Sequence, residues 1–256
     1  MLVYRIYVSP NVEGSAGASE GMGFHTTHWT VIEAAGGGDG TKTRDALASL
    51  CATYWYPLYT FIRRQCPSPH EAEDLTQEFF RQFLERQSVQ KAERSVGKFR
   101  SFLLACLKNF LINERRAATA QRRGGGVATV PLPTNDAETR YLHEPADKLT
   151  PEAVFDRRWG FAVLERTMAD LRREYTIGGK SSLFEDLQGF LPSGQGTLSR
   201  EEVAARRGVT VGAIDVAVHR LRQRFGALLR QEVARTVSSA AEVEDEIRYL
   251  ISVLGC

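Results

Sequence analysis

Hydrophobic side chains recur three and four positions apart along most of the chain, which is the period of an amphipathic α-helix. The first such run starts near Trp29 and continues through the apolar residues Leu47, Leu50, Cys51, Tyr54, Leu58, Phe61 and Ile62. No stretch alternates apolar and polar residues with the period of two that a half-buried β-strand needs. The pattern therefore predicts an all-α protein.

Two further helices are predicted before residue 117. Ser68 is suited to cap a helix that begins at Pro69, and Glu71 completes a capping box with it. The apolar positions of that helix follow every fourth residue, at Leu75, Phe79 and Phe83. A second helix is expected over about residues 99–116, with its apolar side formed by Phe102, Leu103, Cys106, Leu107, Phe110 and Leu111.

The helical pattern fails over residues 117–150, which contain three prolines and a run of three glycines. A segment of this length is too long for a loop inside a compact domain, so we expect a flexible linker. The predicted organisation is a disordered leader at 1–24 (with Met22 as an alternative start), a helical domain at 25–116, the linker, a second helical domain at 151–235 and a C-terminal helix at 236–256. The apolar side of this last helix either covers the core of its own domain, which we favour, or receives a regulatory protein.

The second domain contains the pattern of a helix-turn-helix. Ser199 and Glu202 form another capping box, Gly208 ends the helix where a positive φ is wanted, and Thr210 caps the next helix. The outward face of that next helix is expected to carry cations suited to phosphates and to guanine edges, namely His219, Arg220, Arg222 and Arg224. The same pattern is compatible with an ordinary αα-corner in another helical protein.

Composition excludes several classes of protein. The chain has 256 residues, of which 43% are hydrophobic and 25% charged, as in ordinary globular proteins, and no apolar run is long enough to span a bilayer. The net charge of +2 hides an uneven distribution. Nine basic residues face two acids over 91–123, eight arginines face four acids over 199–235, and five acids face two arginines over 70–86. This distribution indicates one polyanionic partner contacted twice and a separate protein contact.

The first basic segment also has the composition of a single-strand binder. Phe99, Phe102 and Phe110 alternate with cations, and Asn109 and Asn113 lie one helical turn apart. Aromatic platforms with cationic neighbours suit unstacked bases, although any single one of these phenylalanines is more often part of a packed core.

Motifs for catalysis or metal binding are incomplete. The four cysteines share no C-x-x-C spacing, and His70-Glu71 and His143-Glu144 lack the second histidine of a zinc-protease helix. Gly179-Lys180-Ser181 lacks the first glycine of a phosphate loop. We therefore expect no enzymatic activity, no metal site and no cofactor.

Three segments in order resemble the extracytoplasmic-function group of the bacterial sigma-70 family. AEDLTQEFFRQFLE resembles the helix that binds the polymerase clamp, and GKFRSFLLACLKNFLINERRAA resembles the segment that recognises and melts the −10 element. LSREEVAARRGVTVGAIDVAVHRLRQRF resembles the helix-turn-helix that reads the −35 element. The resemblance extends over about residues 27–237.

The resemblance implies a cytoplasmic sigma factor that gives core RNA polymerase its promoter specificity. Contacts with the β′ clamp would come from Asp74, Gln77, Glu78 and Phe80. The −10 element and its separated strand would be held by Phe99, Arg100, Phe102, Lys108, Asn109, Asn113, Arg115 and Arg116. The −35 readers would be Asp215, Val216, His219 and Arg220, with Thr210, Arg222 and Arg224 beside them. The β flap, double- and single-stranded promoter DNA and an anti-sigma factor are the further implied partners, without insertion into a membrane.

Two features depart from the family pattern. Asp215 and Val216 replace a pair that is usually basic or hydroxylated, and the acid is suited to accept from a cytosine amine. The short connection before the helix-turn-helix is replaced by a longer segment at about residues 173–196. The main alternative is a helix-turn-helix regulator that binds DNA without recruiting polymerase, and stable polymerase binding would separate the two.

Overall fold

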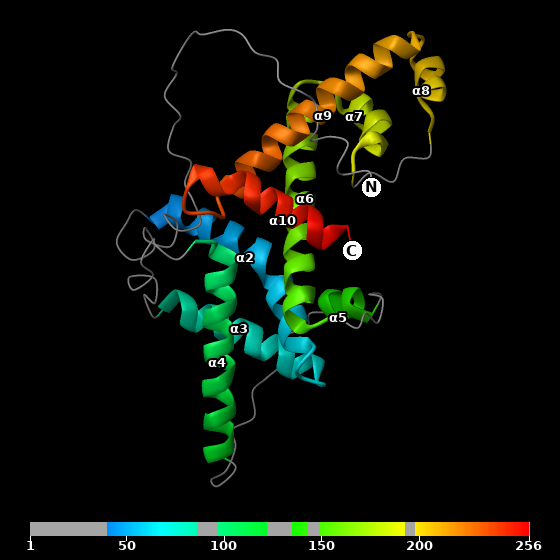
Figure 1. Ribbon diagram of the computed structural model, residues 1–256. Helices are drawn as coiled ribbons and strands as arrows, with labels where there is room; N and C mark the ends of the chain where they lie inside the picture. Colours follow the sequence, from blue (N-terminus) through cyan, green and yellow to red (C-terminus); the bar gives the residue numbers. More distant parts are fainter. Residues whose placement is uncertain (1–39, 86–96, 122–134, 143–148, 193–197, 256) are drawn as a thin grey trace. The chain divides into compact units, whose positions relative to one another are not determined.

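The structure, a computed structural model, describes residues 40–85, 97–121, 135–142, 149–192 and 198–255, and these residues contain helices and no strand (Figure 1). The predicted all-α class is therefore confirmed. The helices are α2 (Gly40–Arg63), α3 (Pro69–Glu85), α4 (Phe99–Gln121), α5 (Asn135–Leu142), α6 (Pro151–Ile177), α7 (Ser181–Leu187), α8 (Arg200–Arg207), α9 (Val211–Ala234) and α10 (Val243–Leu254), with 3-10 turns at Gln188–Phe190 and Ala240–Glu242. The predicted leader lies outside the described residues. No described helix is both long enough and apolar enough to cross a membrane.

The chain divides into two compact units. The first takes the described residues up to Gly160 together with Ala234–Glu242, and the second takes Phe161–Val233 and the described residues from Val243 onward. The division falls inside α6 and near the end of α9, so each of these helices contributes to both units.

Aromatic side chains from three helices form the core of the first unit. The Phe79 ring of α3 lies 5.6 Å from the ring of Phe83 and 5.6 Å from that of Phe110 on α4. Tyr54 of α2 meets Phe99 of α4 edge to face at 5.4 Å, and both side chains are fully buried. The predicted cap of α3 is present, since the Glu71 backbone N–H donates to the Ser68 hydroxyl at 3.3 Å.

The segment predicted as a linker contains helical structure. α4 continues to Gln121, and α5 forms within the remainder of the segment. Glu138 of α5 accepts hydrogen bonds from Arg63 Nη2 at 2.8 Å and from the hydroxyl of Tyr59, both on α2. Arg140 of α5 lies 4.2 Å over the ring of Tyr56. For residues 117–121 and 135–142 the expectation of a flexible linker is corrected, because a short helix with little apolar surface of its own is held by charge and cation–π contacts with a distant helix. Residues 122–134 and 143–148 of the predicted linker lie outside the described residues.

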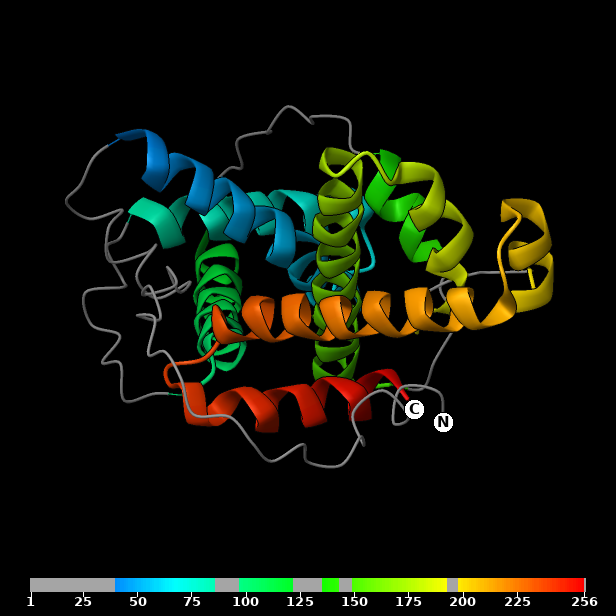
Figure 2. The same ribbon diagram turned by 90° about the horizontal axis from the view of Figure 1, so that it is seen from above.

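In the second unit, α10 begins near the C-terminal end of α9; the two helices look parallel from above (Figure 2) but diverge at an angle in Figure 1. Val243, Ile247 and Leu250 of α10 are buried, and Glu244 pairs with Arg230 of α9 at 2.9 Å. This burial and the pair with Arg230 favour the preferred prediction that the C-terminal helix covers its own domain, which stays a prediction.

A glutamine at position 138 should make the protein less sensitive to acid. The Arg63 guanidinium lowers the pKa of the Glu138 carboxyl below its ordinary value of 4.5, despite partial burial. A lowered folded-state pKa gives stability above the unfolded pKa, and that stability is lost as the pH falls through the folded value. Between pH 7 and the acid range, thermal unfolding of Glu138→Gln should therefore change less than that of the wild type. Glu185→Gln, at an exposed position of α7, is the control and should follow the wild type.

Candidate functional site

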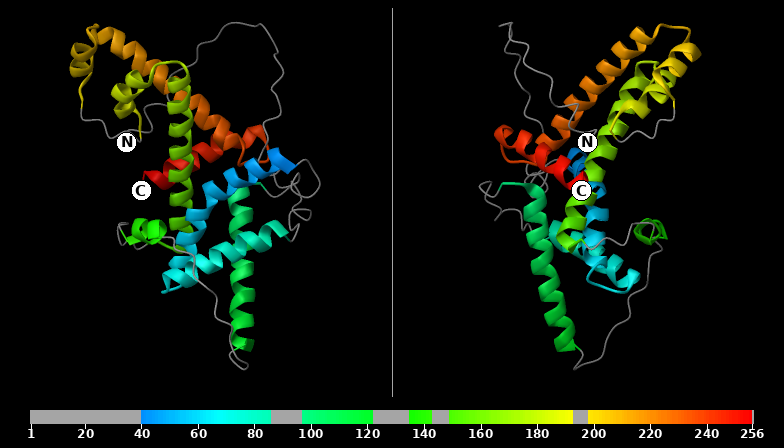
Figure 3. Two further views of the ribbon diagram at one scale, coloured as in Figure 1. Left: turned by 180° about the vertical axis from the view of Figure 1, so that it is seen from behind. Right: turned by 45° about the vertical axis from the view of Figure 1, so that its right-hand side comes forward.

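The helix-turn-helix forms as the sequence predicts. Ser199 and Glu202 make both halves of the capping box of α8, and Gly208 ends that helix with φ 65° and ψ 32°. The Ala213 backbone N–H donates to the Thr210 hydroxyl at 3.2 Å, so Thr210 caps α9. Val203, Ala204, Ile214, Val218 and Leu221 are buried where the helices meet. α8 lies beside the N-terminal end of α9 in both views of Figure 3.

Many arginines of the second unit form ion pairs or hydrogen bonds with carboxylates and carbonyls of that unit. Asp186 of α7 receives Arg206 at 3.0 Å and Arg207 at 2.6 Å. Arg224 pairs with Glu174 of α6 and lowers the pKa of that carboxyl. These contacts join α8 and α9 to the helices before them.

Arg222 therefore differs from the outward-facing residue that the sequence predicts, whereas Arg224 is exposed but already paired with Glu174. Arg222 donates to the Phe190 carbonyl from Nε at 3.1 Å and from Nη2 at 2.9 Å, and its burial lowers its pKa. The correction has a physical reason: both side chains find oxygen acceptors on earlier helices, which a helical pattern does not reveal.

A small open face remains on α9. Val216 is 50% exposed, and His219 and Arg220, one turn further on, are exposed. Neither His219 nor Arg220 makes a hydrogen bond or ion pair with another described residue. Asp215 lies next to this face but pairs with Arg200 at 3.0 Å. The face thus combines two uncommitted polar donors with one apolar side chain.

On α4 the residues predicted to hold nucleic acid divide into covered and open groups. Phe99 is fully buried, and Arg100 is 7% exposed and pairs with Asp156 of α6 at 2.7 Å. Phe102 is half-buried, with its ring 6.3 Å from that of Phe83. Neither Phe99 nor Arg100 is open to a ligand in this structure, because the first turns of α6 and the aromatic core cover them.

The other predicted residues of α4 are exposed. They are Lys108, which pairs with Glu152 at 2.8 Å, Arg115, which donates to Gln65 at 3.1 Å, and Asn109, Asn113 and Arg116. Ile112, which was not among the predicted residues, is 45% exposed between Asn109 and Asn113. The sequence could have indicated this exposure, since Ile112 lies outside both rows of apolar residues on the predicted helix.

The acidic helix α3 presents part of its predicted protein-binding set. Asp74 and Gln77 are exposed, and Glu78 is half-buried and pairs with Arg81 on the same helix. Phe80 is only 6% exposed, with its ring 5.8 Å from that of Phe79, so it supports this surface from below and corrects the expectation of an exposed contact.

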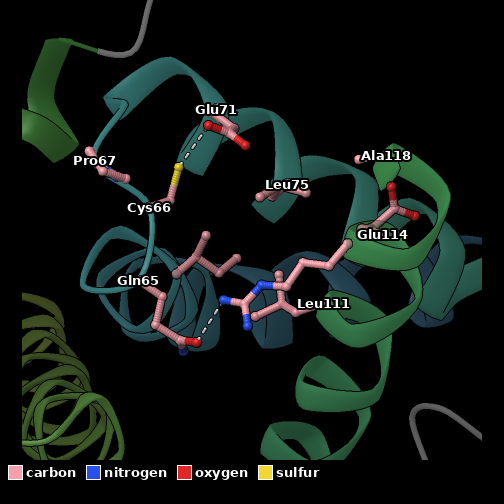
Figure 4. Close-up of a pocket in the computed structure, with 10 residues that line it drawn as sticks. Gln65, Cys66, Pro67, Glu71, Leu75, Leu111, Glu114 and Ala118 are labelled. Atoms are coloured by element: carbon pink, nitrogen blue, oxygen red, sulfur yellow. Dashed lines mark hydrogen bonds between the residues drawn. The ribbon is translucent and has the colours of Figure 1, made fainter. Parts of the chain in front are cut away.

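A cavity of about 300 Å³ lies between the end of α2, the start of α3 and the last turns of α4 (Figure 4). Cys66 at its edge donates from Sγ to Glu71 Oε2 at 3.1 Å, and burial together with this carboxylate raises the thiol pKa. A protonated thiol is a poor nucleophile and a poor metal ligand. No cluster of metal-ligating side chains occurs among the described residues.

Comparison with known proteins identifies relatives for much of the chain. Residues 52–121 match the model of sigma-70 region 2. The chain is 29% identical over 185 residues to the ECF RNA polymerase sigma factor SigE of Mycolicibacterium smegmatis, and the match includes 72% of this chain and 61% of that protein. The match thus spans about three fifths of the length of this curated relative. No solved structure matches.

Two glycines of the helix-turn-helix should respond oppositely to alanine. Gly208 has a positive φ, where a Cβ is strained, so Gly208→Ala should lower the free energy of unfolding by about 1–2 kcal/mol. Gly212 lies in the first turn of α9, and a Cβ there would meet nothing within 4 Å. Gly212→Ala should leave stability unchanged or raise it by up to about 1 kcal/mol. Thermal and urea unfolding measure both, and equal losses would contradict the assigned backbone conformations.

Proposed function

We propose that this chain, a member of the sigma-70 family that resembles its extracytoplasmic-function group, binds core RNA polymerase and directs it to promoters. The proposal rests chiefly on one observation: the region 2 match spans the second half of α2 and the whole of α3 and α4, the helices that carry the acidic surface and the open asparagines. Transcription initiation requires a factor that contacts both polymerase and DNA, and these two surfaces have the corresponding charges.

The exposed acids of α3 provide the polymerase contact. Asp74 and Gln77 face solvent one turn apart, and Phe80, one turn after Gln77, is buried. An acidic surface repels nucleic acid and favours a basic protein partner such as the β′ clamp. Glu78, already paired with Arg81, would shape this surface more than bind through it.

The open side of α4 provides the contact with the −10 element. Asn109 and Asn113 have amides that can donate to and accept from base edges, and Arg116 supplies charge for a phosphate. Exposed Ile112 between them is an apolar contact for an unstacked base. Strand capture of this kind requires binding and no catalytic side chain, so the chemistry of transcription belongs to the polymerase.

The open face of α9 provides the contact with the −35 element. Arg220 suits the O6 and N7 acceptors of guanine, and the methyl groups of Val216 suit the C5-methyl of thymine. Because Asp215 pairs with Arg200, we assign it to orienting α9 on α8 rather than to reading cytosine. The second unit also offers the surface for the β flap, and an anti-sigma factor would act by covering either unit.

The test combines polymerase binding with promoter-directed transcription. Purified full-length protein is assayed for capture of bacterial core polymerase and for run-off transcription on a genomic fragment library. Asp74→Ala with Gln77→Ala should weaken polymerase capture at least tenfold, because it removes the exposed contact. Arg220→Ala should leave capture unchanged and reduce promoter-directed transcription at least tenfold.

Arg206→Ala is the matched control for Arg220→Ala, because it removes an exposed arginine of the same unit whose partner is Asp186. Specific DNA binding without any polymerase capture would replace the proposal with the stand-alone helix-turn-helix regulator. Equal loss of both activities in both variants would contradict the assigned division between α3 and α9.

Thymine recognition by Val216 can be tested with a single methyl group. Once a −35 sequence is known, each thymine is replaced in turn by deoxyuridine, which lacks only the C5-methyl. At one position the wild type should lose about 2- to 5-fold in affinity, as expected for one apolar contact. Val216→Ala should bind both DNAs equally at that position. If deoxyuridine lowers the affinity of Val216→Ala as much as that of the wild type at every position, Val216 does not contact a thymine methyl.

A further inference from the structure

Two carboxylates of α6 occupy two cations of α4. Asp156 pairs with Arg100 at 2.7 Å and Glu152 pairs with Lys108 at 2.8 Å. The four residues belong to the first unit, which includes the start of α6 up to Gly160. Arg100 precedes Lys108 by two turns, whereas Asp156 follows Glu152 by one, so the two helices run in opposite directions where these pairs form.

The contact between α4 and α6 is buried at the Arg100–Asp156 pair and exposed to solvent at the Lys108–Glu152 pair. Arg100 is 7% exposed, its guanidinium lies 5.2 Å from the centre of the Trp159 ring, and Trp159 is fully buried. The side chains of Lys108 and Glu152 are instead 46% and 44% exposed. The start of α6 is therefore anchored by Trp159 and Asp156 and is open to solvent at Glu152.

A carboxylate bound in this way resembles a phosphate in its chemistry. Guanidinium and ammonium groups donate charge-assisted hydrogen bonds to carboxylate and phosphate oxygens alike. A nucleic-acid strand cannot reach Arg100 while Asp156 and Trp159 cover it, and at Lys108 it competes with Glu152 for the ammonium group. Both cations lie in the segment that the proposed function assigns to the −10 element.

We propose that the segment Glu152–Trp159 is an autoinhibitory cover, whose two carboxylates compete with the phosphates of a nucleic-acid strand for Arg100 and Lys108. The cover keeps the free protein from binding single strands and is displaced when a strand is presented by the polymerase. This inference rests on the proposed function, because it assumes that α4 binds nucleic acid.

The test measures binding of the full-length protein to a fluorescein-labelled oligothymidylate by fluorescence anisotropy across a range of salt concentrations. Glu152→Gln removes one competing charge at an exposed position and should preserve the fold. It should bind about 3-fold more tightly at low salt. The plot of log affinity against log salt should become steeper by about 0.7, the value for one additional phosphate contact on a single strand.

The double variant Glu152→Gln, Asp156→Asn removes both competing carboxylates, so that a strand has only the Trp159 contact to displace at Arg100. It should bind about 10-fold more tightly, with a slope steeper by about 1.4. Circular dichroism and thermal unfolding establish whether this variant is folded. Glu185→Gln is the matched control for net charge, since it removes an exposed carboxylate on α7 of the other unit. Its slope should equal that of the wild type.

Glu152→Gln combined with Lys108→Gln gives the decisive comparison, because it removes the cation that the first substitution frees. This variant should lose the gain in affinity and in slope. If Glu152→Gln binds the oligothymidylate no more tightly than Glu185→Gln does, the proposed cover is contradicted, even if the wild type directs transcription. A gain in oligonucleotide binding without promoter-directed transcription by the wild type would support the cover and contradict the sigma function.

Discussion

The pairing of Arg100 with Asp156 is the contact on which the arrangement of α4 and α6 depends. A buried guanidinium is strongly unfavourable without a counter-charge, and here Asp156 and the Trp159 ring together replace its water. Val154 and Phe155 of α6, next to Asp156 in the chain, are buried. The Arg100–Asp156 pair decides which face of α4 remains open, and so it leaves Asn109, Asn113 and Arg116 as the accessible polar surface.

In the second unit, too, arginines pair with acceptors on other helices, although several of these arginines are exposed. Its arginines hold the helix-turn-helix together through Asp186, Glu174 and the Phe190 carbonyl, so only a few of them are available to an external anion. A count of basic residues therefore overstates the binding surface. The open residues His219 and Arg220 form a narrow face on α9, which suits recognition of a few bases more than extended contact with phosphates.

Local signals in the sequence predicted the helices well. Both Ser199 with Glu202 and Gly208 act within one turn of their own position, and the structure confirms each of them. Long-range partners could not be predicted in this way. Arg100 and Asp156 are 56 positions apart, Arg63 and Glu138 are 75 apart, and Arg224 and Glu174 are 50 apart. Helical periodicity shows which side of a helix is polar, but it does not identify the carboxylate that a given arginine meets.

The docking of α5 on α2 also affects the entropy of closing the chain. Without it, the start of α6 would be tethered to the first unit only through the connection between Gln121 and Pro151. With α5 held by Arg63 and Tyr59, the effective tether runs from Leu142 to Pro151 and is roughly threefold shorter. Loop closure becomes easier by about 1 kcal/mol for such a shortening. The effective concentration of Glu152 and Asp156 near α4 rises accordingly, so the docking of α5 on α2 strengthens the competition for both cations.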